Sequence, residues 1–321
     1  MVKLAIVHGH MSDATPMLTI LTPTRNAGEY LNVAVQSVKD SASRSYEHIV
    51  IDDGSTDGST QDLLKWFPHD RELKVVSNPG VGKVAALNAG YSLSSGSLVT
   101  TLDADDALHP DYFRWLSHRA EAWDAMIRDY WVTDGSLKPI GEYVISRDLV
   151  RCSFTEAVSQ LVSIPRASWT ITRSIADRVF PIPEELPFED VWLSLIVRRY
   201  AYNIASGRKP MYYYRQHTDQ TFGGVLNYRP AITRFRARRL SEYARLLPRL
   251  ASRFEVEELP DLRPVGRYYE RLGASRLPLR SILAPGIGWR ARLKLIVFRK
   301  LWPLLGVGKR IQWLITSRHT T

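Results

Sequence analysis

Four short apolar segments alternate with helical patterns in the first third of the chain, and this alternation restricts the fold more than any other feature. The apolar segments are Met17 to Thr24, His48 to Asp52, Leu73 to Ser77 and a fourth that starts at Leu98. Apolar residues recur at helical spacing between them, in a stretch opening at Arg25, in Thr60 to Phe67 and in Lys83 to Ser92. Strands joined by single helices need crossover connections. The sequence therefore predicts an α/β fold with a mainly parallel, doubly wound sheet.

Polar residues close three of these apolar segments. They are Thr22-Pro23-Thr24, Asp52-Asp53 and Asp103-Ala104-Asp105-Asp106. In open parallel sheets, ligands bind outside the carboxyl ends of the strands. Three carboxylates after a buried strand are costly to keep charged unless a cation meets them. Each segment alone would also suit an ordinary turn, but their corresponding positions favour one shared binding cleft.

Composition excludes several classes of protein. The 321 residues are 45% hydrophobic, as is usual for a globular chain. The single cysteine, Cys152, rules out an internal disulfide framework and a cysteine-rich zinc site, which fits a reducing compartment. No run approaches eighteen apolar residues, so we predict no membrane-spanning helix. Residues 1–16 lack the pattern of a signal peptide, and we expect a leader or expression remnant there.

The net charge of +10 is concentrated at the C-terminus. Arg271 to Thr321 holds eleven Lys or Arg and no acidic residue, which leaves 32 basic and 33 acidic residues before it. We predict a helical, basic region over residues 223–321. Its tryptophan-bearing amphipathic pattern suits an anionic membrane surface, and it equally suits a helix packed on the preceding domain. We expect no nucleic-acid partner, because no recognition module accompanies the charge.

Five collinear motifs resemble the GT-A glycosyltransferases, specifically the inverting family 2. They are Leu18 to Asn26, Val50 to Ser59, Gly82-Lys83 with Leu87 to Gly90, Gly96 to Asp106 with Pro110, and Phe188 to Trp192. The resemblance covers Leu18 to His217. It implies a Rossmann-like GT-A catalytic domain over residues 17–222, with a nucleotide-binding half (17–110) and an acceptor half (111–222).

The resemblance also implies a nucleoside-diphosphate-sugar donor and a divalent cation, Mn²⁺ or Mg²⁺. Hard cations prefer carboxylate and phosphate oxygens, and Asp105 is the expected metal ligand. Asp103 would face the ribose or the water shell of the metal, and the role of Asp106 stays open. Asp53 matches the position that binds a uracil-type N–H, which favours a UDP- or dTDP-type donor. The other expected nucleotide contacts are Pro23, Thr24, Glu29 and Lys83.

On the acceptor side, the resemblance assigns the general base to Asp190, with its neighbour Glu189 as runner-up. His217 would reach the metal or the diphosphate, although an ordinary loop histidine is an equal alternative. Trp169 and Trp192 would stack on an acceptor sugar, although core packing is an equal alternative.

These assignments predict a metal-dependent, inverting transfer of a sugar to the hydroxyl of a glycan or lipid-linked acceptor. We expect a role in cell-surface polysaccharide or glycolipid assembly, in the cytoplasm at the inner face of the membrane. One alternative is a sugar-nucleotide nucleotidyltransferase, although Thr22 to Tyr30 contains a single glycine and no basic phosphate loop. The other is an inactive glycan-binding relative, because Ala86 stands where many family members carry arginine.

Overall fold

A computed structural model describes residues 16–117, 123–217 and 230–274 of the chain. The chain divides into two compact units, each discontinuous in sequence. The first, here called the sheet unit, comprises Met1–Ile145, Ile164–Glu184 and Tyr200–Arg215. The second, the helical unit, comprises Ser146–Ser163, Glu185–Arg199 and Gln216–Thr321. The division thus differs from the single boundary predicted at residue 222, because two internal segments group with the C-terminal region.

The sheet unit begins with the predicted alternation. Its first elements are β1 (Leu18–Thr24), α1 (Glu29–Ser41), β2 (Tyr46–Asp52), α2 (Ser59–Trp66), β3 (Leu73–Ser77), α3 (Lys83–Ser92) and β4 (Leu98–Thr101). The four strands are parallel and lie in the order β3-β2-β1-β4. The predicted mainly parallel, doubly wound sheet is therefore confirmed for this half.

Later segments extend the same sheet with mixed polarity. They are β5 (Ala107–Leu108), α4 (Tyr112–Ser117), β6 (Ala125–Thr133), β7 (Pro139–Tyr143), the 3-10 turn η1 (Arg166–Ser168), β8 (Trp169–Thr172), α7 (Arg173–Val179) and β9 (Ile204–Arg215). Strand β8 runs antiparallel to β4 and β6, whereas β9 runs parallel to β6. The full order is β3-β2-β1-β4-β8-β6-β9-β5, with β7 paired to β6.

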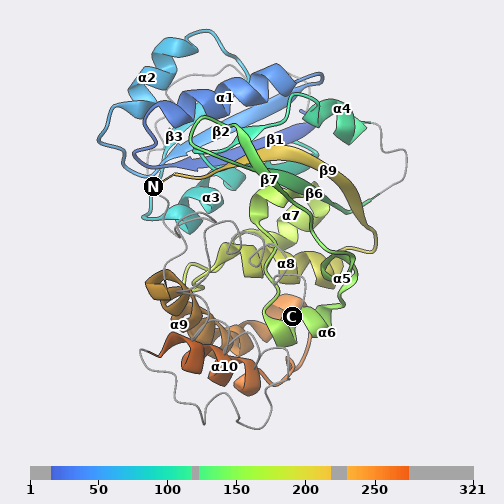
Figure 1. The fold of residues 1–321 in the computed structure, drawn as a ribbon. Coiled ribbons are helices and arrows are strands. Elements are labelled where there is room, and N and C mark those ends of the chain that lie inside the picture. Colours follow the sequence, from blue (N-terminus) through green and yellow to red (C-terminus); the bar gives the residue numbers. More distant parts are fainter. Residues whose placement is uncertain (1–15, 118–122, 218–229, 275–321) are drawn as a thin grey trace. The chain divides into compact units, whose positions relative to one another are not determined.

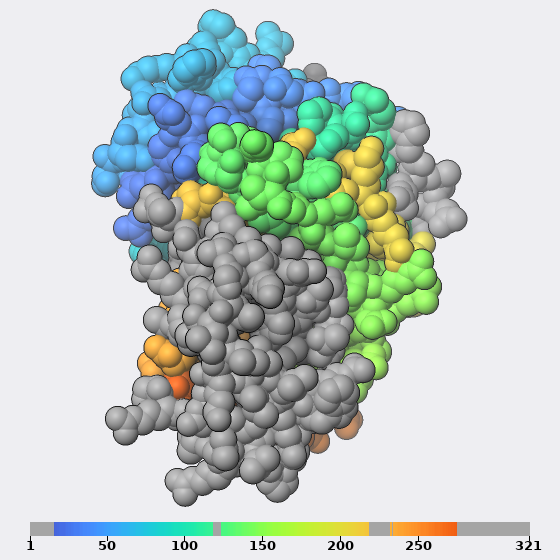
Figure 2. Space-filling model, viewed as in Figure 1, coloured from blue at the N-terminus to red at the C-terminus, as the bar shows by residue number. Residues whose placement is uncertain are grey.

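Helices cover both faces of the sheet. Helices α1 and α2 lie on one face, and α3 and α7 lie on the other (Figure 1). Figure 2 shows the outer surface of α1 and α2 in blue. On their inner side, Leu31 and Val35 of α1 pack with Val50 of β2. Helix α3 approaches the sheet so closely that a Cβ at Gly90 would lie 2.5 Å from the Ile51 side chain. Glycine at position 90 therefore sets the spacing between α3 and β2.

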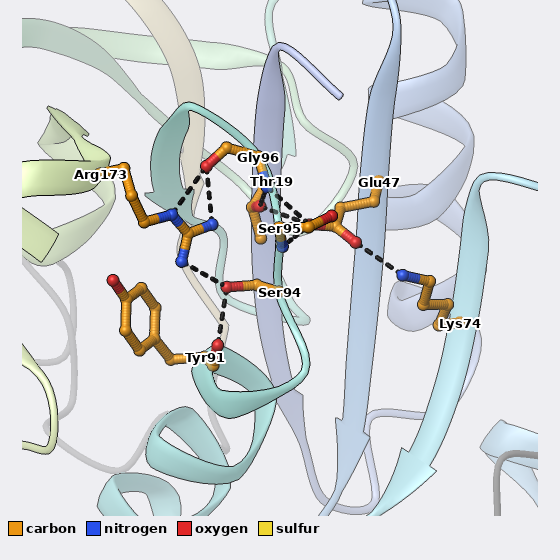
Figure 3. Close-up of polar contacts among 8 residues, drawn as sticks. All are labelled: Thr19, Glu47, Lys74, Tyr91, Ser94, Ser95, Gly96 and Arg173. Atoms are coloured by element: carbon orange, nitrogen blue, oxygen red, sulfur yellow. Dashed lines mark hydrogen bonds and ion pairs between the residues drawn. The ribbon is translucent and has the colours of Figure 1, made fainter. Parts of the chain in front are cut away.

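A buried carboxylate fixes the amino ends of the parallel strands (Figure 3). Glu47 of β2 accepts hydrogen bonds from Thr19 Oγ1 at 2.7 Å and from the Gly96 amide at 3.0 Å. Burial raises the pKa of Glu47, but Lys74, the Ser95 amide and Thr19 outweigh it and hold the pKa below its usual value. The connection that leads from α3 into β4 is thereby tied to β1 and β2, which sets the register of the strand that ends at the acidic motif.

His48 makes folding stability depend on pH. It is fully buried in β2, with Nε2 2.8 Å from Thr22 Oγ1, and burial lowers its pKa to about 4 against a small opposing effect of Asp70. The unfolded chain binds this proton near pH 6.5. Between these values only the unfolded state gains the proton, so we expect the free energy of unfolding to fall by up to about 3 kcal/mol as pH drops from 6.5 to 4. Urea unfolding of the wild type and His48→Gln at several pH values measures the difference, and parallel pH dependences would refute the assignment.

The helical unit contains α5 (Arg147–Arg151), α6 (Phe154–Gln160), α8 (Glu189–Tyr200), α9 (Pro230–Leu246), the 3-10 segment η2 (Leu247–Phe254) and α10 (Arg263–Gly273). Ser153 and Glu156 form a capping box that starts α6. The rings of Phe154 and Trp192 both contact Phe254, with centroids 5.2 and 5.3 Å apart. Three separated segments of the chain therefore meet in one core.

Among the described helices, none is long and apolar enough to span a bilayer. Helices α9 and α10 lie within the predicted helical region. The basic segment from Arg276 to Arg318 lies outside the described residues, as does the predicted leader over residues 1–15, so both assignments stay predictions.

Candidate donor and metal site

The carboxyl ends of β1 and β2 lie side by side. Thr24 is the register partner of Asp52, and the Asp53 amide donates to the Thr24 carbonyl at 2.9 Å. Pro23 and Thr24 are buried, whereas Glu29 is exposed in the first turn of α1. The structure thus brings two of the three polar strand ends together, as predicted.

Asp53 organises the loop that precedes α3. Its Oδ1 accepts hydrogen bonds from Asn78 Nδ2 at 2.7 Å and from the Gly82 amide at 2.8 Å. Gly82 has a φ of 91°, a left-handed value that favours glycine. This bend places Lys83, the first residue of α3, next to the end of β4, where its Nζ lies 3.3 Å from Asp103 Oδ1.

The third strand end carries the acidic turn, here defined as Asp103 to Asp106. Arg166 of η1 forms a bidentate ion pair with Asp103, with Nη1 3.1 Å from Oδ2 and Nη2 bonded to Oδ1. Burial raises the pKa of Asp103, but Arg166 and Lys83 outweigh it and hold this pKa below its usual value. Asp103 therefore stays ionised between two cations.

Arg215, the last residue of β9, holds the rest of the acidic turn. Its amide donates to Asp106 Oδ1 at 2.9 Å, and its Nε donates to the Asp105 carbonyl at 2.6 Å. The guanidinium also lies over the Tyr30 ring, 4.4 Å from the centroid. Asp106 is completely buried, and its Oδ2 has no hydrogen-bond partner among the described residues. Burial, together with Asp105 and Asp103, raises the pKa of Asp106 well above its usual value.

The three carboxylates of the acidic turn thus have different surroundings. Asp106 is buried and its pKa is raised, and both oxygens of Asp103 contact Arg166. The Asp105 side chain is only half-buried. No group of three or more His, Cys, Asp or Glu side chains suited to a metal occurs in the described part of the chain. The residues fit a divalent cation that Asp105 would hold, because hard cations prefer carboxylate oxygens. They do not favour Asp103 as a direct ligand.

Sequence reasoning missed Arg166 and Arg215. Neither belongs to a spaced motif, since each is a single arginine far along the chain from the acidic turn. The acidic turn itself could have indicated that such arginines exist, because three carboxylates so close in sequence need cations from other segments of the fold. The topology supplies them through η1 and the end of β9.

The predicted base lies in the helical unit. Glu189 and Asp190 are half-buried in the first turn of α8. Arg239 of α9 donates from Nη2 to the Pro187 carbonyl at 3.0 Å, which fixes the residue that leads into this turn. Burial and, to a smaller extent, Glu189 raise the pKa of the buried Tyr243 phenol, also on α9. Helix α9 therefore contacts the segment that carries both candidate bases.

Three other predicted residues fall elsewhere. His217 is half-buried in the helical unit, and its metal role stays a prediction. Trp169 is 1% exposed in β8, and Trp192 is 0% exposed in α8. Burial leaves neither indole a face on which a sugar could stack. Their acceptor role was wrong, and the core-packing alternative describes both.

Comparison with known proteins identifies a family match in the first half of the chain. The family model "Glycosyl transferase family 2" matches residues 19–136. The chain is 26% identical to the glycosyltransferase GlyG of Streptococcus pneumoniae over 161 residues, 49% of this chain and 53% of that protein. It is 28% identical to the hyaluronan synthase of Pasteurella multocida over 109 residues, 34% of this chain and 11% of that protein. The chain therefore spans about half, or less, of the length of these relatives.

Two solved structures share the fold. TarS 1–349 of Staphylococcus aureus, in complex with UDP-GlcNAc, is 16% identical with a TM-score of 0.53, over 94% of this chain and 90% of that chain. The mannosyltransferase PcManGT of Pyrobaculum calidifontis, in complex with GDP-Man and Mn²⁺, is 15% identical with a TM-score of 0.56, over 96% and 87%. At these identities the similarity establishes the fold alone.

Proposed function

We propose that this protein is a metal-dependent, inverting glycosyltransferase, because residues 19–136 match the model of glycosyl transferase family 2 and the chain shares the fold of two solved glycosyltransferases. It moves a sugar from a nucleoside diphosphate to an acceptor hydroxyl. The observation that carries the proposal is the acidic turn, in which Asp105 follows Asp103 at the end of β4 while Lys83 and Arg166 meet Asp103.

Each residue of the proposed site has one task. Asp53 accepts a hydrogen bond from the base, and Lys83 donates to a phosphate oxygen. Asp105 would hold Mn²⁺ or Mg²⁺, which would supply positive charge to stabilise the departing diphosphate. Asp190 takes the proton of the attacking hydroxyl. Attack opposite the leaving group inverts the anomeric carbon.

A carboxylate at the base favours uracil or thymine over cytosine. A carboxylate only accepts hydrogen bonds, and the N3–H of uracil or thymine donates one, whereas N3 of cytosine does not. One structural neighbour was solved with UDP-GlcNAc and the other with GDP-Man, which supports a nucleotide-sugar donor of some kind. We propose a UDP- or dTDP-linked sugar.

A panel of nucleotide sugars tests the function. Incubation of each donor with Mn²⁺, with and without simple sugar acceptors, should release the nucleoside diphosphate from one donor class, and EDTA should stop the release. Release of pyrophosphate from sugar phosphate and nucleoside triphosphate would instead identify a nucleotidyltransferase. Donor binding without hydrolysis or transfer would identify an inactive relative.

We further propose that the reaction serves cell-surface glycan assembly at the inner face of the membrane. The match to the hyaluronan synthase of Pasteurella multocida supports a glycan product, and the basic tail, Arg271 to Thr321, supports membrane attachment. We expect the full chain to sediment with phosphatidylglycerol vesicles, and a variant lacking Arg280 to Thr321 to remain in the supernatant. Neutral phosphatidylcholine vesicles are the control. Equal sedimentation of both proteins with the anionic vesicles would refute the membrane role of the tail.

A further inference from the structure

The two residues that precede α8, Pro187 and Phe188, are unusual for the start of a helix. Ser, Thr, Asp and Asn are preferred there, because their side chains accept hydrogen bonds from the first helical amides, and neither proline nor phenylalanine can do so. Helix α8 begins at Glu189, so its hydrogen-bond ladder begins with the Phe188 carbonyl and leaves out the carbonyl of the buried Pro187. A buried carbonyl outside the ladder needs a partner from another segment.

Arg239 of α9 is that partner. Its Nη2 donates to the Pro187 carbonyl at 3.0 Å. The guanidinium carbon lies 5.6 Å from the centroid of the Phe188 ring and 5.7 Å from that of the Phe235 ring, and both distances are within the range of a cation–π contact. One side chain of α9 therefore contacts both residues that precede α8, the first through its backbone and the second through its ring.

The same face of α9 reaches the first residue of α8. Phe235, Arg239 and Tyr243 follow one another at four-residue intervals, so they lie on one side of the helix. Burial raises the pKa of the Tyr243 phenol, and the charge of Glu189 raises it further, which places Glu189 near this phenol. The three side chains thus lie along the start of α8.

Packing alone does not explain an arginine at position 239. Its Nε is buried and has no hydrogen-bond partner among the described residues, and burying a polar group in this way is costly. An apolar side chain of similar length could fill the space between the two rings without this cost. A guanidinium adds a directional bond to the Pro187 carbonyl while its plane contacts the rings. The arrangement therefore favours a role in fixing the backbone before α8.

We propose that Arg239 is a positioning residue for the candidate base Asp190: by holding the Pro187 carbonyl and the Phe188 ring, it fixes the start of α8, whose second residue is Asp190. The inference rests on the proposed function for the role of Asp190. The positioning itself depends on contacts that need no ligand, so the two can be tested separately.

The first test is hydrogen exchange without ligand. Arg239→Met keeps an apolar side chain and removes the hydrogen bond and the charge. A hydrogen bond to a charged group contributes enough stability that its loss should speed local exchange by about 10-fold. We expect this in residues 188–194, and no change in residues 196–200. The control is Arg238→Met, because Arg238 also donates to a backbone carbonyl, from Nε to Gly273 of α10 at 2.9 Å. This control should leave both segments of α8 unchanged.

The second test is steady-state kinetics, corrected for the folded fraction by thermal unfolding. A small misplacement of a catalytic group costs up to about 100-fold in rate, so Arg239→Met should lower kcat by about 10- to 100-fold. The KM for the donor should stay at the wild-type value, because the base acts on the acceptor hydroxyl. Arg239→Lys should recover part of kcat, since an ammonium can also donate to the carbonyl and lie over a ring. Arg238→Met should keep the wild-type kcat.

The outcomes separate the positioning role from the proposed function. If the wild type transfers sugar from no donor, the proposed function fails, and hydrogen exchange alone decides whether Arg239 fixes the start of α8. Unchanged exchange in residues 188–194 overturns the positioning role. A wild-type kcat in Arg239→Met, an equal loss in Arg238→Met, or a raised donor KM with an unchanged kcat overturns the link from Arg239 to the base.

Discussion

Replacing Asp105 by asparagine should lower glycosyl transfer by roughly 1000-fold, the loss expected when a main stabiliser of transition-state charge is removed. Asp105 is half-buried, whereas Asp106 is fully buried and Asp103 contacts Arg166 through both of its oxygens. An amide binds a hard cation more weakly than a carboxylate does. Initial rates at saturating donor, measured over a range of Mn²⁺ concentrations, would reveal the loss, and thermal unfolding would show that the fold is kept.

Asp106→Asn is the matched control for Asp105. Asp106 is buried, its pKa is raised, and its Oδ1 accepts the Arg215 amide, a bond that an asparagine oxygen can also accept. We therefore expect a much smaller loss of transfer than in Asp105→Asn. If Asp105→Asn transferred sugar at nearly the wild-type rate while Asp106→Asn did not, the assignment of the metal to Asp105 would be wrong.

Asp190→Asn should abolish transfer while preserving donor affinity. Loss of a general base costs roughly 10²- to 10⁴-fold in rate, and this base acts on the acceptor rather than on the nucleotide. The measurement is the transfer rate together with the dissociation constant of the donor nucleotide, each compared with the wild type. A parallel loss of donor affinity would indicate a structural role for Asp190.

Glu189→Gln separates the two candidate bases. Both side chains are half-buried in the first turn of α8, and Glu189 affects the buried Tyr243. We expect Glu189→Gln to retain most of its transfer activity and Asp190→Asn to lose it. The reverse pattern would move the role of base to Glu189.

The parallel half of the sheet could be predicted from sequence because the strands and helices that build it alternate within a short stretch of the chain. Alternating strands and helices place Asp53 and Asp103 at the carboxyl ends of β2 and β4, and a parallel sheet brings such ends to one edge. The glycine bend before α3 was sufficient to predict that Lys83 lies near this edge. In the structure Lys83 contacts Asp103 there.

The remaining features depend on contacts between distant segments. Arg166 is 63 residues from Asp103, and Arg215 is 109 residues from Asp106. No rule based on the spacing of residues in the sequence predicts which distant residues form such pairs. The predicted acceptor role of the two tryptophans failed for a related reason. A tryptophan looks the same in the sequence whether it packs in a core or stacks on a sugar. Trp192 is covered by Phe254, which lies far along the chain.

The contact between Trp192 and Phe254 also affects the order in which the molecule can be completed during synthesis. Arg199 donates to the Phe254 carbonyl at 2.6 Å, so the end of α8 is bound by the same late segment. The ribosome must therefore translate beyond residue 254 before Phe254 can pack against α8. Domains emerge and fold from the N-terminus onward, so the strands of the sheet unit can form while the helix with the candidate base still lacks its packing partner. A chain terminated before Phe254 would keep the strands of the donor site and expose an apolar helix to the proteins that capture incomplete products.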